Sequence, residues 1–174
     1  MAPAQTSLLA KLDTQQRVRD FLTNAIASGR ASHAYLFLGA PGAGKLDAAW
    51  ALAQAFLCER DGCDSCDSCV RVARHTHPDV HYYTPESATG YLIAQTRELL
   101  DDVPLAPIRA KAKVYIIDRA EQLRANTANA LLKTLEEPPE HVLFILATTE
   151  LHKVPATILS RCQRFDFRRI GAED

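Results

Sequence analysis

The sequence of 174 residues has no long apolar run and no excess of charge of either sign. No stretch approaches the roughly 18 consecutive apolar residues that a membrane-spanning helix requires. The N-terminal segment lacks the basic and apolar parts of a secretory signal, so the expected location is the cytoplasm. Because the formal net charge is −1, the domain as a whole lacks the basic footprint of a nucleic-acid-binding protein. Any affinity for DNA therefore has to come from local patches or from partner subunits.

Repeats, low-complexity tracts and internal linkers are also lacking. Hydrophobic residues make up 47% of the chain and charged residues 24%, which is close to the average for globular domains. The length corresponds to about one domain, and a chain of this size buries a core without depending on metals or disulfides for its whole stability.

Short apolar runs alternate along the chain with segments of helical periodicity. The runs predict strands at residues 34–38, 80–84, 113–118, 142–149 and 163–167, and the periodic segments predict helices at 13–29, 45–58, 92–103 and 123–137. The apolar face expected for the first helix consists of Val18, Phe21, Leu22, Ala25 and Ile26. Because the strands are apolar throughout, they predict a parallel sheet with helices on both faces, the three-layer α/β/α class.

Residues 39–46 read GAPGAGKL, which matches the phosphate-binding motif G-x-x-x-x-G-K-[ST] except at its last position. The loop lies between an expected strand and an expected helix, the context in which a P-loop occurs; a chance glycine turn is the alternative. The helix N-terminus and the lysine would face the phosphates. The leucine removes the hydroxyl that binds magnesium, which argues against Mg²⁺ but leaves binding of ATP or ADP open. The expected nucleotide-binding residues here are Gly39, Pro41, Gly42, Gly44, Lys45 and Leu46.

The third expected strand ends in an acid, Asp118, in the way that ATPases present a carboxylate to magnesium. Active ATPases usually follow this acid with a glutamate that polarises the attacking water, but Arg119 stands here, and Glu121 would need a different path to the γ-phosphate. The alternative is that Asp118 only caps the next helix.

Four of the five cysteines, Cys58, Cys63, Cys66 and Cys69, fall within twelve residues with the spacing C-x4-C-x2-C-x2-C. In a reducing compartment this spacing favours a metal over disulfides, and four thiolates close a tetrahedral zinc site with no position left for catalysis. Unligated or redox-active thiols are the alternative. Cys162 stands apart and is expected to be a small core residue.

Arg161, in the segment LSRCQRF, is a candidate arginine finger, a residue that stabilises transition-state charge at another subunit's γ-phosphate. On spacing alone, a solvated surface arginine is the more common explanation.

Taken together, SHAYLFLGAPGAGK, the four-cysteine segment, THPDV, KVYIID, NALLKTLEEPPEHVLFILATT and ILSRCQRF resemble the bacterial DNA polymerase III clamp-loader subunits. The resemblance spans about residues 13 to 168, and NALLKTLEEPP followed by ILSRC is its most specific part. It implies that the whole chain, 1–174, is a P-loop nucleotide-binding subdomain of the AAA+ (RecA-like) type. It further implies five parallel strands and a zinc module inserted at about 58–77. The family's lid and collar domains would be missing, as in a truncated chain.

The resemblance also assigns roles to single residues. Arg161 matches the family's trans-acting arginine finger, and Thr148 or Thr149 matches the position that senses the γ-phosphate in active members. Leu46 and the pair Asp118–Arg119 depart from the gamma/tau subunit, which usually has Thr and Asp-Glu at these positions. Both departures favour the delta-prime type, with little or no ATPase activity of its own.

A delta-prime-like subunit would act as a component of the DNA polymerase III holoenzyme. Its expected partners are the gamma/tau and delta subunits, and through the assembly the sliding clamp and primed DNA. The alternatives are a gamma/tau-type ATPase that hydrolyses ATP itself and, more remotely, a stand-alone nucleotide-binding regulator.

Overall fold

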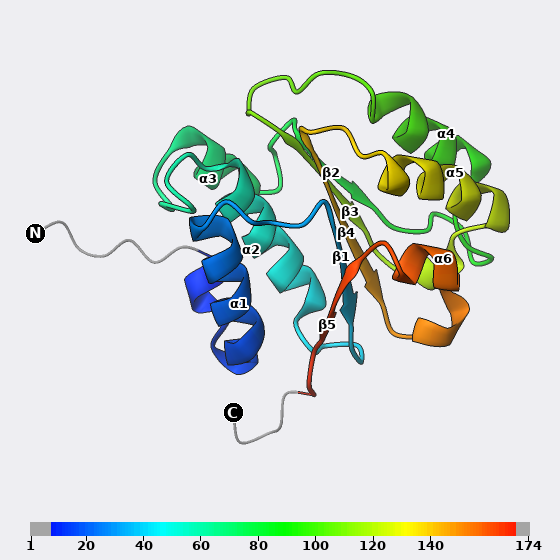
Figure 1. Cartoon of the computed structure of the whole chain (residues 1–174), viewed down its shortest axis with the longest axis horizontal. Coiled ribbons are helices and arrows are strands. Elements are labelled where there is room, and N and C mark those ends of the chain that lie inside the picture. Colours follow the sequence, from blue (N-terminus) through cyan, green and yellow to red (C-terminus); the bar gives the residue numbers. More distant parts are fainter. Residues whose placement is uncertain (1–7, 170–174) are drawn as a thin grey trace, which may run out of the picture.

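The computed structural model describes residues 8–169, in which strands and helices alternate along the chain (Figure 1). The strands are β1 (Ala34–Leu38), β2 (Val80–Tyr83), β3 (Lys113–Ile117), β4 (Val142–Thr148) and β5 (Gln163–Asp166). The α-helices are α1 (Gln16–Ala27), α2 (Lys45–Leu57), α3 (Asp67–Ala73), α4 (Ile93–Asp102), α5 (Ala125–Glu136) and α6 (Ala156–Leu159). Short 3-10 helices lie at Leu9–Lys11, Asp13–Gln15, Ala120–Gln122 and Leu151–Lys153.

The five strands form one sheet in the order β2-β3-β4-β1-β5, and every neighbouring pair is parallel. β1 lies between β4 and β5, with Leu38 opposite Thr148 on one side and Asp166 on the other. This confirms the predicted five-stranded parallel sheet. In such a sheet the carboxyl ends of all strands meet at one edge, where ligands of open α/β folds bind.

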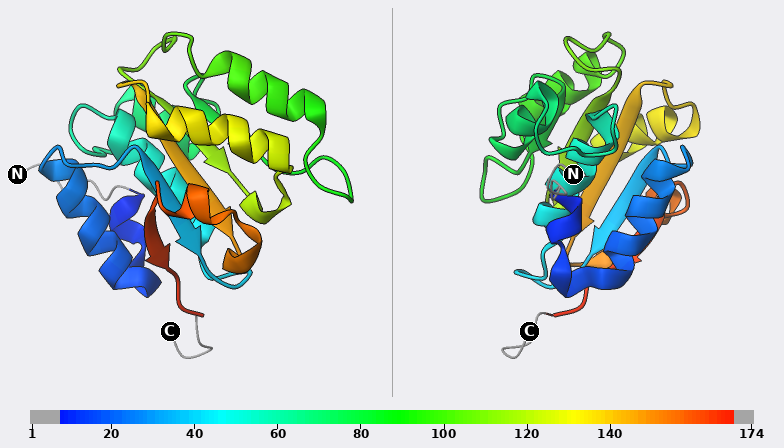
Figure 2. Two further views of the ribbon diagram at one scale, coloured as in Figure 1. Left: turned by 45° about the vertical axis from the view of Figure 1, so that its right-hand side comes forward. Right: turned by 90° about the vertical axis from the view of Figure 1, so that its left-hand side faces the viewer.

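Two hydrophobic cores cover the two faces of the sheet, so the domain has three layers (Figures 1 and 2). Along β1, Tyr35 and Phe37 pack into the core shared with α1 and α2, whereas Ala34 and Leu36 pack into the core shared with α4, α5 and α6. β3 and β4 divide their side chains between the two cores in the same alternating way. Burial on both faces explains why these strands are apolar throughout.

Two features of the helices differ from the sequence-based expectations. α3 was not expected; it is a seven-residue helix whose first turn is capped by a cysteine, because the Cys66 sulfur accepts from the Cys69 N–H. Phe21 was expected on the buried face of the first helix, but it is 48% exposed. Its ring packs edge-on against Phe165 of β5, with 5.1 Å between ring centroids. The apolar stripe of α1 therefore extends past the edge of the core.

A buried carboxylate, Asp79, fixes the start of the edge strand β2. Asp79 is fully buried and accepts backbone N–H bonds from Ile108 (2.6 Å), Arg109 (2.7 Å) and Ala110 (2.7 Å). Its own carbonyl accepts from Val114 N–H at 2.8 Å. Burial alone would raise the pKa of Asp79, but the three amide donors hold it below its usual value of 3.8.

We expect Asp79→Asn to lower the free energy of unfolding by about 2 to 3 kcal/mol at pH 7, because the amide removes charge-assisted bonds to buried donors. An acid whose pKa is lower in the folded than in the unfolded protein stabilises the fold at pH values above its unfolded-state pKa. This stabilisation is lost as the pH falls through the folded-state pKa. The difference between wild type and Asp79→Asn should therefore shrink below about pH 4. Urea unfolding between pH 3.5 and 7 measures this, with Asp101→Asn on the exposed side of α4 as control. A difference that stays constant with pH would contradict the charge argument.

Within residues 8–169, no helix combines the length and the hydropathy that crossing a membrane would require. The N- and C-terminal segments 1–7 and 170–174, which belong to the predicted domain 1–174, lie outside the described residues.

Candidate functional site

The loop after β1 has the backbone conformation of a phosphate-binding turn. Gly42 and Gly44 have φ values of +80° and +89°, which side chains disfavour, and Gly44 is the residue from which α2 starts. At Gly39 a Cβ atom would come within 2.9 Å of the Phe167 Cβ, so the close approach of the chain after β5 requires glycine. The loop therefore needs glycine for two different reasons.

The Lys45 side chain is buried beneath this loop. Its ammonium donates to the carbonyls of Gly39 (2.6 Å) and Ala40 (3.1 Å), and only 8% of the residue is exposed. Burial lowers the pKa of Lys45, and the charges of Asp118 and Glu121 act in the opposite direction. The cation therefore lies within electrostatic range of the two acids that follow β3.

Asp118 comes directly after β3, and its two oxygens are held separately. One accepts from the Tyr82 hydroxyl at 3.0 Å and the other from the Arg119 N–H at 2.8 Å. The Tyr91 hydroxyl lies within hydrogen-bond distance of the backbone carbonyls of Asp118 and Tyr83 and can donate its one hydrogen to either of them. The carboxylate is thus fixed by the edge strand and by the turn, and it does not cap a helix through its side chain.

Thr148, the last residue of β4, is buried and bonded on both sides. Its hydroxyl donates to Glu121 at 2.7 Å and accepts from the Glu150 N–H at 3.0 Å. Thr149 follows and is exposed. The turn that begins at Arg119, a left-handed residue with φ +50°, carries Glu121 to this position. Glu121 therefore has a path into the site, which the sequence did not reveal.

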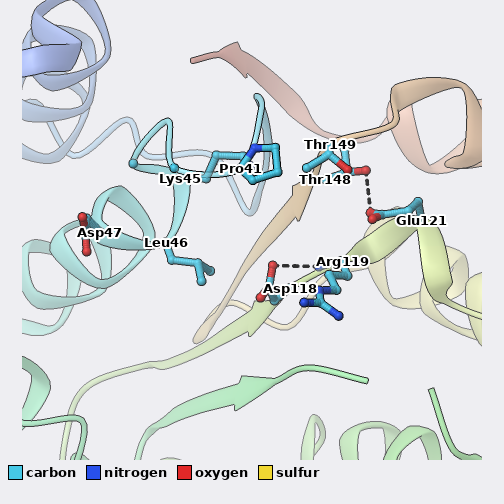
Figure 3. A pocket seen from close by; sticks show the side chains of 11 residues that line it. Pro41, Lys45, Leu46, Asp47, Asp118, Arg119, Glu121, Thr148 and Thr149 are labelled. Carbon is cyan, nitrogen blue, oxygen red and sulfur yellow. Dashed lines mark hydrogen bonds between the residues drawn. The ribbon is translucent and has the colours of Figure 1, made fainter. Parts of the chain in front are cut away.

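These elements enclose a cavity of about 400 Å³ at the carboxyl edge of the sheet (Figure 3). It is lined by Pro41, Gly42, Gly44, Lys45, Leu46, Asp47, Asp118, Arg119, Glu121, Thr148 and Thr149. All the predicted residues of the phosphate loop except Gly39 line it, as do the acid after β3 and both threonines. Gly39 packs behind the loop against Phe167. Figure 3 shows Leu46 pointing from α2 toward Asp118.

One supporting residue could not be found from local sequence. The Gln15 side chain is buried, donates to the carbonyls of Ala43 (3.1 Å) and Arg168 (2.8 Å), and accepts from the Arg168 N–H. It connects the phosphate loop to the segment after β5. Its partners are distant in the chain, so no motif marks it.

The four clustered cysteines converge on one point. Their sulfurs all lie within 4.8 Å of one another, with 3.9 Å between Cys58 and Cys66 and 4.0 Å between Cys63 and Cys69. Four sulfurs at about 2.3 Å from one ion in tetrahedral geometry would be about 3.8 Å apart. The four cysteines are thus positioned to bind a metal ion.

Donors around the sulfurs favour thiolates. Backbone N–H groups of Arg60, Cys63, Cys66 and Cys69 each point at a cysteine sulfur at 3.3 to 3.4 Å. Chiefly the Ser65 backbone amide lowers the pKa of Cys63 to about 5, while burial raises the pKa of Cys69. The Arg60 guanidinium adds a donor to Cys63 at 3.3 Å.

The histidines after the cluster have other partners. His77 is buried, bonds Ser68 through Nε2 (2.9 Å) and accepts from the Asp79 N–H through Nδ1 (3.0 Å). Burial lowers its pKa. His75 stacks on Trp50, with 3.8 Å between ring centroids. Both ring nitrogens of His77 are therefore engaged in tying the cysteine segment to β2.

Arg161 lies away from the cavity. It follows α6 and precedes β5, and its guanidinium donates to Ser160 (2.9 Å) and to Glu136 of α5 (2.9 Å). β5 starts opposite Tyr35 of β1, and the chain runs from there along β1 to Gly39 over about 13 Å, at about 3.3 Å per residue. Arg161 therefore lies near the amino ends of the strands, whereas the cavity lies at their carboxyl ends.

A phosphate loop after the central strand β1, an acid after β3 and a polar residue ending β4, on a parallel sheet of this order, define a P-loop domain of the AAA+ class. Solved structures share the fold. A DNA polymerase III gamma subunit-related protein from Thermotoga maritima superposes with a TM-score of 0.61 at 22% identity, over 88% of this chain and 46% of that one. The T. maritima RuvB Holliday junction branch migration motor gives 0.57 at 18% identity, over 95% and 48%.

The family model described as "DNA polymerase III, delta subunit" matches residues 14–171. DNA polymerase III subunit tau of Bacillus subtilis is 45% identical over 91% of this chain and 29% of its own length. Subunit delta' of the same organism is 41% identical over 90% of this chain and 48% of its own length. Subunit tau of Escherichia coli is 44% identical over 91% and 25%. The chain belongs to the family of DNA polymerase III clamp-loader subunits, and it spans a quarter to about half of these relatives' lengths.

Proposed function

We propose that the protein is a delta-prime-type subunit of the DNA polymerase III clamp loader, with a nucleotide site that no longer hydrolyses ATP. The observation that carries this proposal is the lining of the cavity, to which Leu46 and Arg119 both belong. Leucine offers no ligand to magnesium, and arginine stays protonated, so it cannot act as the base that activates water.

The nearest replacement acid does not restore this chemistry. Glu121 lines the cavity, but its carboxylate accepts from the Thr148 hydroxyl at 2.7 Å. Glu121 and Thr148, a residue expected to sense the γ-phosphate, are thus hydrogen-bonded to each other. Asp118 is likewise bonded through both oxygens. The site keeps the shape of an ATPase, and both of its acids already accept hydrogen bonds from the protein.

The position and exposure of Arg161 support a role at a neighbouring subunit's site. It lies near the amino ends of the strands, away from the cavity at their carboxyl ends, and its side chain is 41% exposed. Its ion pair with Glu136 is equally open to solvent, and exposed pairs contribute only about 0 to 1 kcal/mol. The guanidinium would exchange this weak, exposed pair for an ATP on an adjacent gamma/tau subunit, whose hydrolysis it would promote.

The same proposal includes the partners and the metal. The gamma/tau and delta subunits would surround this domain in the loader, which acts on the sliding clamp and primed DNA as a whole. The four-cysteine site would hold a structural Zn²⁺, because four thiolates at tetrahedral spacing suit zinc and leave no open position.

A gamma/tau-type ATPase is the second candidate, and the 45% identity to a tau subunit favours it. The two candidates differ in turnover by the isolated protein. We expect ATP hydrolysis with Mg²⁺ to be indistinguishable from that of Lys45→Ala, which defines the background. Lysine-dependent turnover of about 1 per second, within the usual enzyme range, would reject the delta-prime proposal and establish the gamma/tau type.

A further inference from the structure

The cavity does not fit the magnesium ion that hydrolysing P-loop domains use. Mg²⁺ demands near-octahedral oxygen ligands, usually one or two carboxylates, waters and the phosphates, and a P-loop adds a Ser or Thr hydroxyl. Here Leu46 projects an apolar side chain toward Asp118 (Figure 3). Each Asp118 oxygen already accepts a hydrogen bond, and Glu121 accepts from Thr148. A metal there would lose its hydroxyl ligand, would meet the apolar Leu46 side chain in its place, and would share both acids with these hydrogen bonds.

The lining of the cavity includes a permanent cation, the exposed side chain of Arg119. Arg119 follows Asp118 directly and lines the same cavity. Its backbone is held in the left-handed region by the bond from its N–H to Asp118 and by the Gln122 N–H, which donates to its carbonyl at 2.9 Å. Among residues 8–169, no carboxylate forms an ion pair with its guanidinium. The charge is therefore available to a ligand.

Guanidinium chemistry suits this place. Its planar donors bind two phosphate oxygens at once, and it keeps its charge at every physiological pH. A second cation, Lys45, lies at the loop, and the loop amides and the N-terminus of α2 add positive potential. A dication placed next to Arg119 would be repelled, whereas a polyphosphate would be attracted by both side chains.

We propose that the cavity binds a nucleoside di- or triphosphate without magnesium, and that the Arg119 guanidinium contacts the phosphates where relatives use the metal. This inference rests on the proposed function only in taking the cavity as a nucleotide site. It makes Arg119 a binding residue rather than a lost catalytic one, and it makes the site a structural nucleotide holder.

Calorimetric titration of ATP and of ADP, each in excess Mg²⁺ and in EDTA, tests the proposal. For the wild type we expect the two dissociation constants to agree within about threefold. Arg119→Ala should weaken binding about tenfold or more in both buffers, equivalent to about 1.4 kcal/mol or more. Arg124→Ala, an exposed arginine outside the cavity lining, should bind as the wild type does.

The double variant Leu46→Thr/Arg119→Glu restores the hydroxyl and the acid. We expect its binding to require Mg²⁺ and to weaken about tenfold or more in EDTA. Circular dichroism and thermal melting establish that each variant is folded. Wild-type binding that requires Mg²⁺, binding unaffected by Arg119→Ala, or no binding of either nucleotide at about 1 mM would each overturn the inference. None of these outcomes measures ATP turnover by the isolated protein, which tests the delta-prime proposal, so the two proposals can fail separately.

Discussion

Replacing Arg161 with alanine is expected to lower ATP turnover at the neighbouring subunit's site by about 10³-fold or more, because an arginine finger contributes that much to the transition state. Steady-state ATPase of the loader, assembled from this protein with gamma/tau and delta in the presence of clamp and primed DNA, measures the effect. The isolated protein should show no change, since Arg161 cannot reach its own cavity across the sheet.

Two variants separate a finger from a merely structural arginine. Arg161→Lys keeps the charge but loses the planar donors, so turnover should stay low. Arg164→Ala removes an arginine of similar exposure on β5, whose partner is Asp166 of the same strand, and should leave turnover unchanged. Size-exclusion chromatography establishes that each loader assembles. Full activity of Arg161→Ala in an assembled loader would remove the finger from the proposal.

Removing the metal is expected to unfold the segment 58–77 while the sheet stays folded. Structural zinc contributes about 10 to 16 kcal/mol of binding free energy at pH 7, which is more than the hydrogen bonds of His77 and the burial of Val72 are expected to supply to this segment. The strands β1, β3 and β4 are buried on both faces by other elements. Hydrogen exchange with and without a strong chelator should show fast exchange in 58–77 and retained protection in β3 and β4.

Elemental analysis should find one zinc per chain in the wild type and a loss of it in Cys69→Ser, whose thiol is buried in the cluster. Cys162→Ser is the matched control, because this partly buried thiol packs against the other core and lies outside the cluster. Zinc well below one per chain in the wild type, or unchanged in Cys69→Ser, would contradict the site.

The strands and the phosphate loop were predictable because their signals are local. A run such as VLFILATT is apolar on both faces, and every residue of β4 is in fact buried. α3 was missed because seven residues carry too little periodicity, and because its cap is a cysteine sulfur. Phe21 was misplaced because periodicity shows which residues share a face but not where the neighbouring core ends.

Some residues of the candidate site were also predictable from local sequence and others were not. The phosphate loop and the acid after β3 belong to recognisable motifs, whereas Gln15, Tyr82 and Tyr91 contact the site from distant parts of the chain. Glu121 was recognised but could not be placed, since its position depends on the left-handed turn at Arg119. A sequence pattern names the residues of a turn, but only the folded chain shows which of them meet.

The bonds of Asp79 set the register of the edge strand. β2 has only four residues, and it lies along the chain between the cysteine segment and the strand β3 that carries Asp118. A slip of one residue would turn every side chain of a strand to the opposite face, and Tyr82 would then leave Asp118. The carboxylate that binds the 108–110 loop thus keeps the tyrosine on the correct side of the sheet. A residue at the far end of β2 in this way determines the geometry of the acid in the cavity.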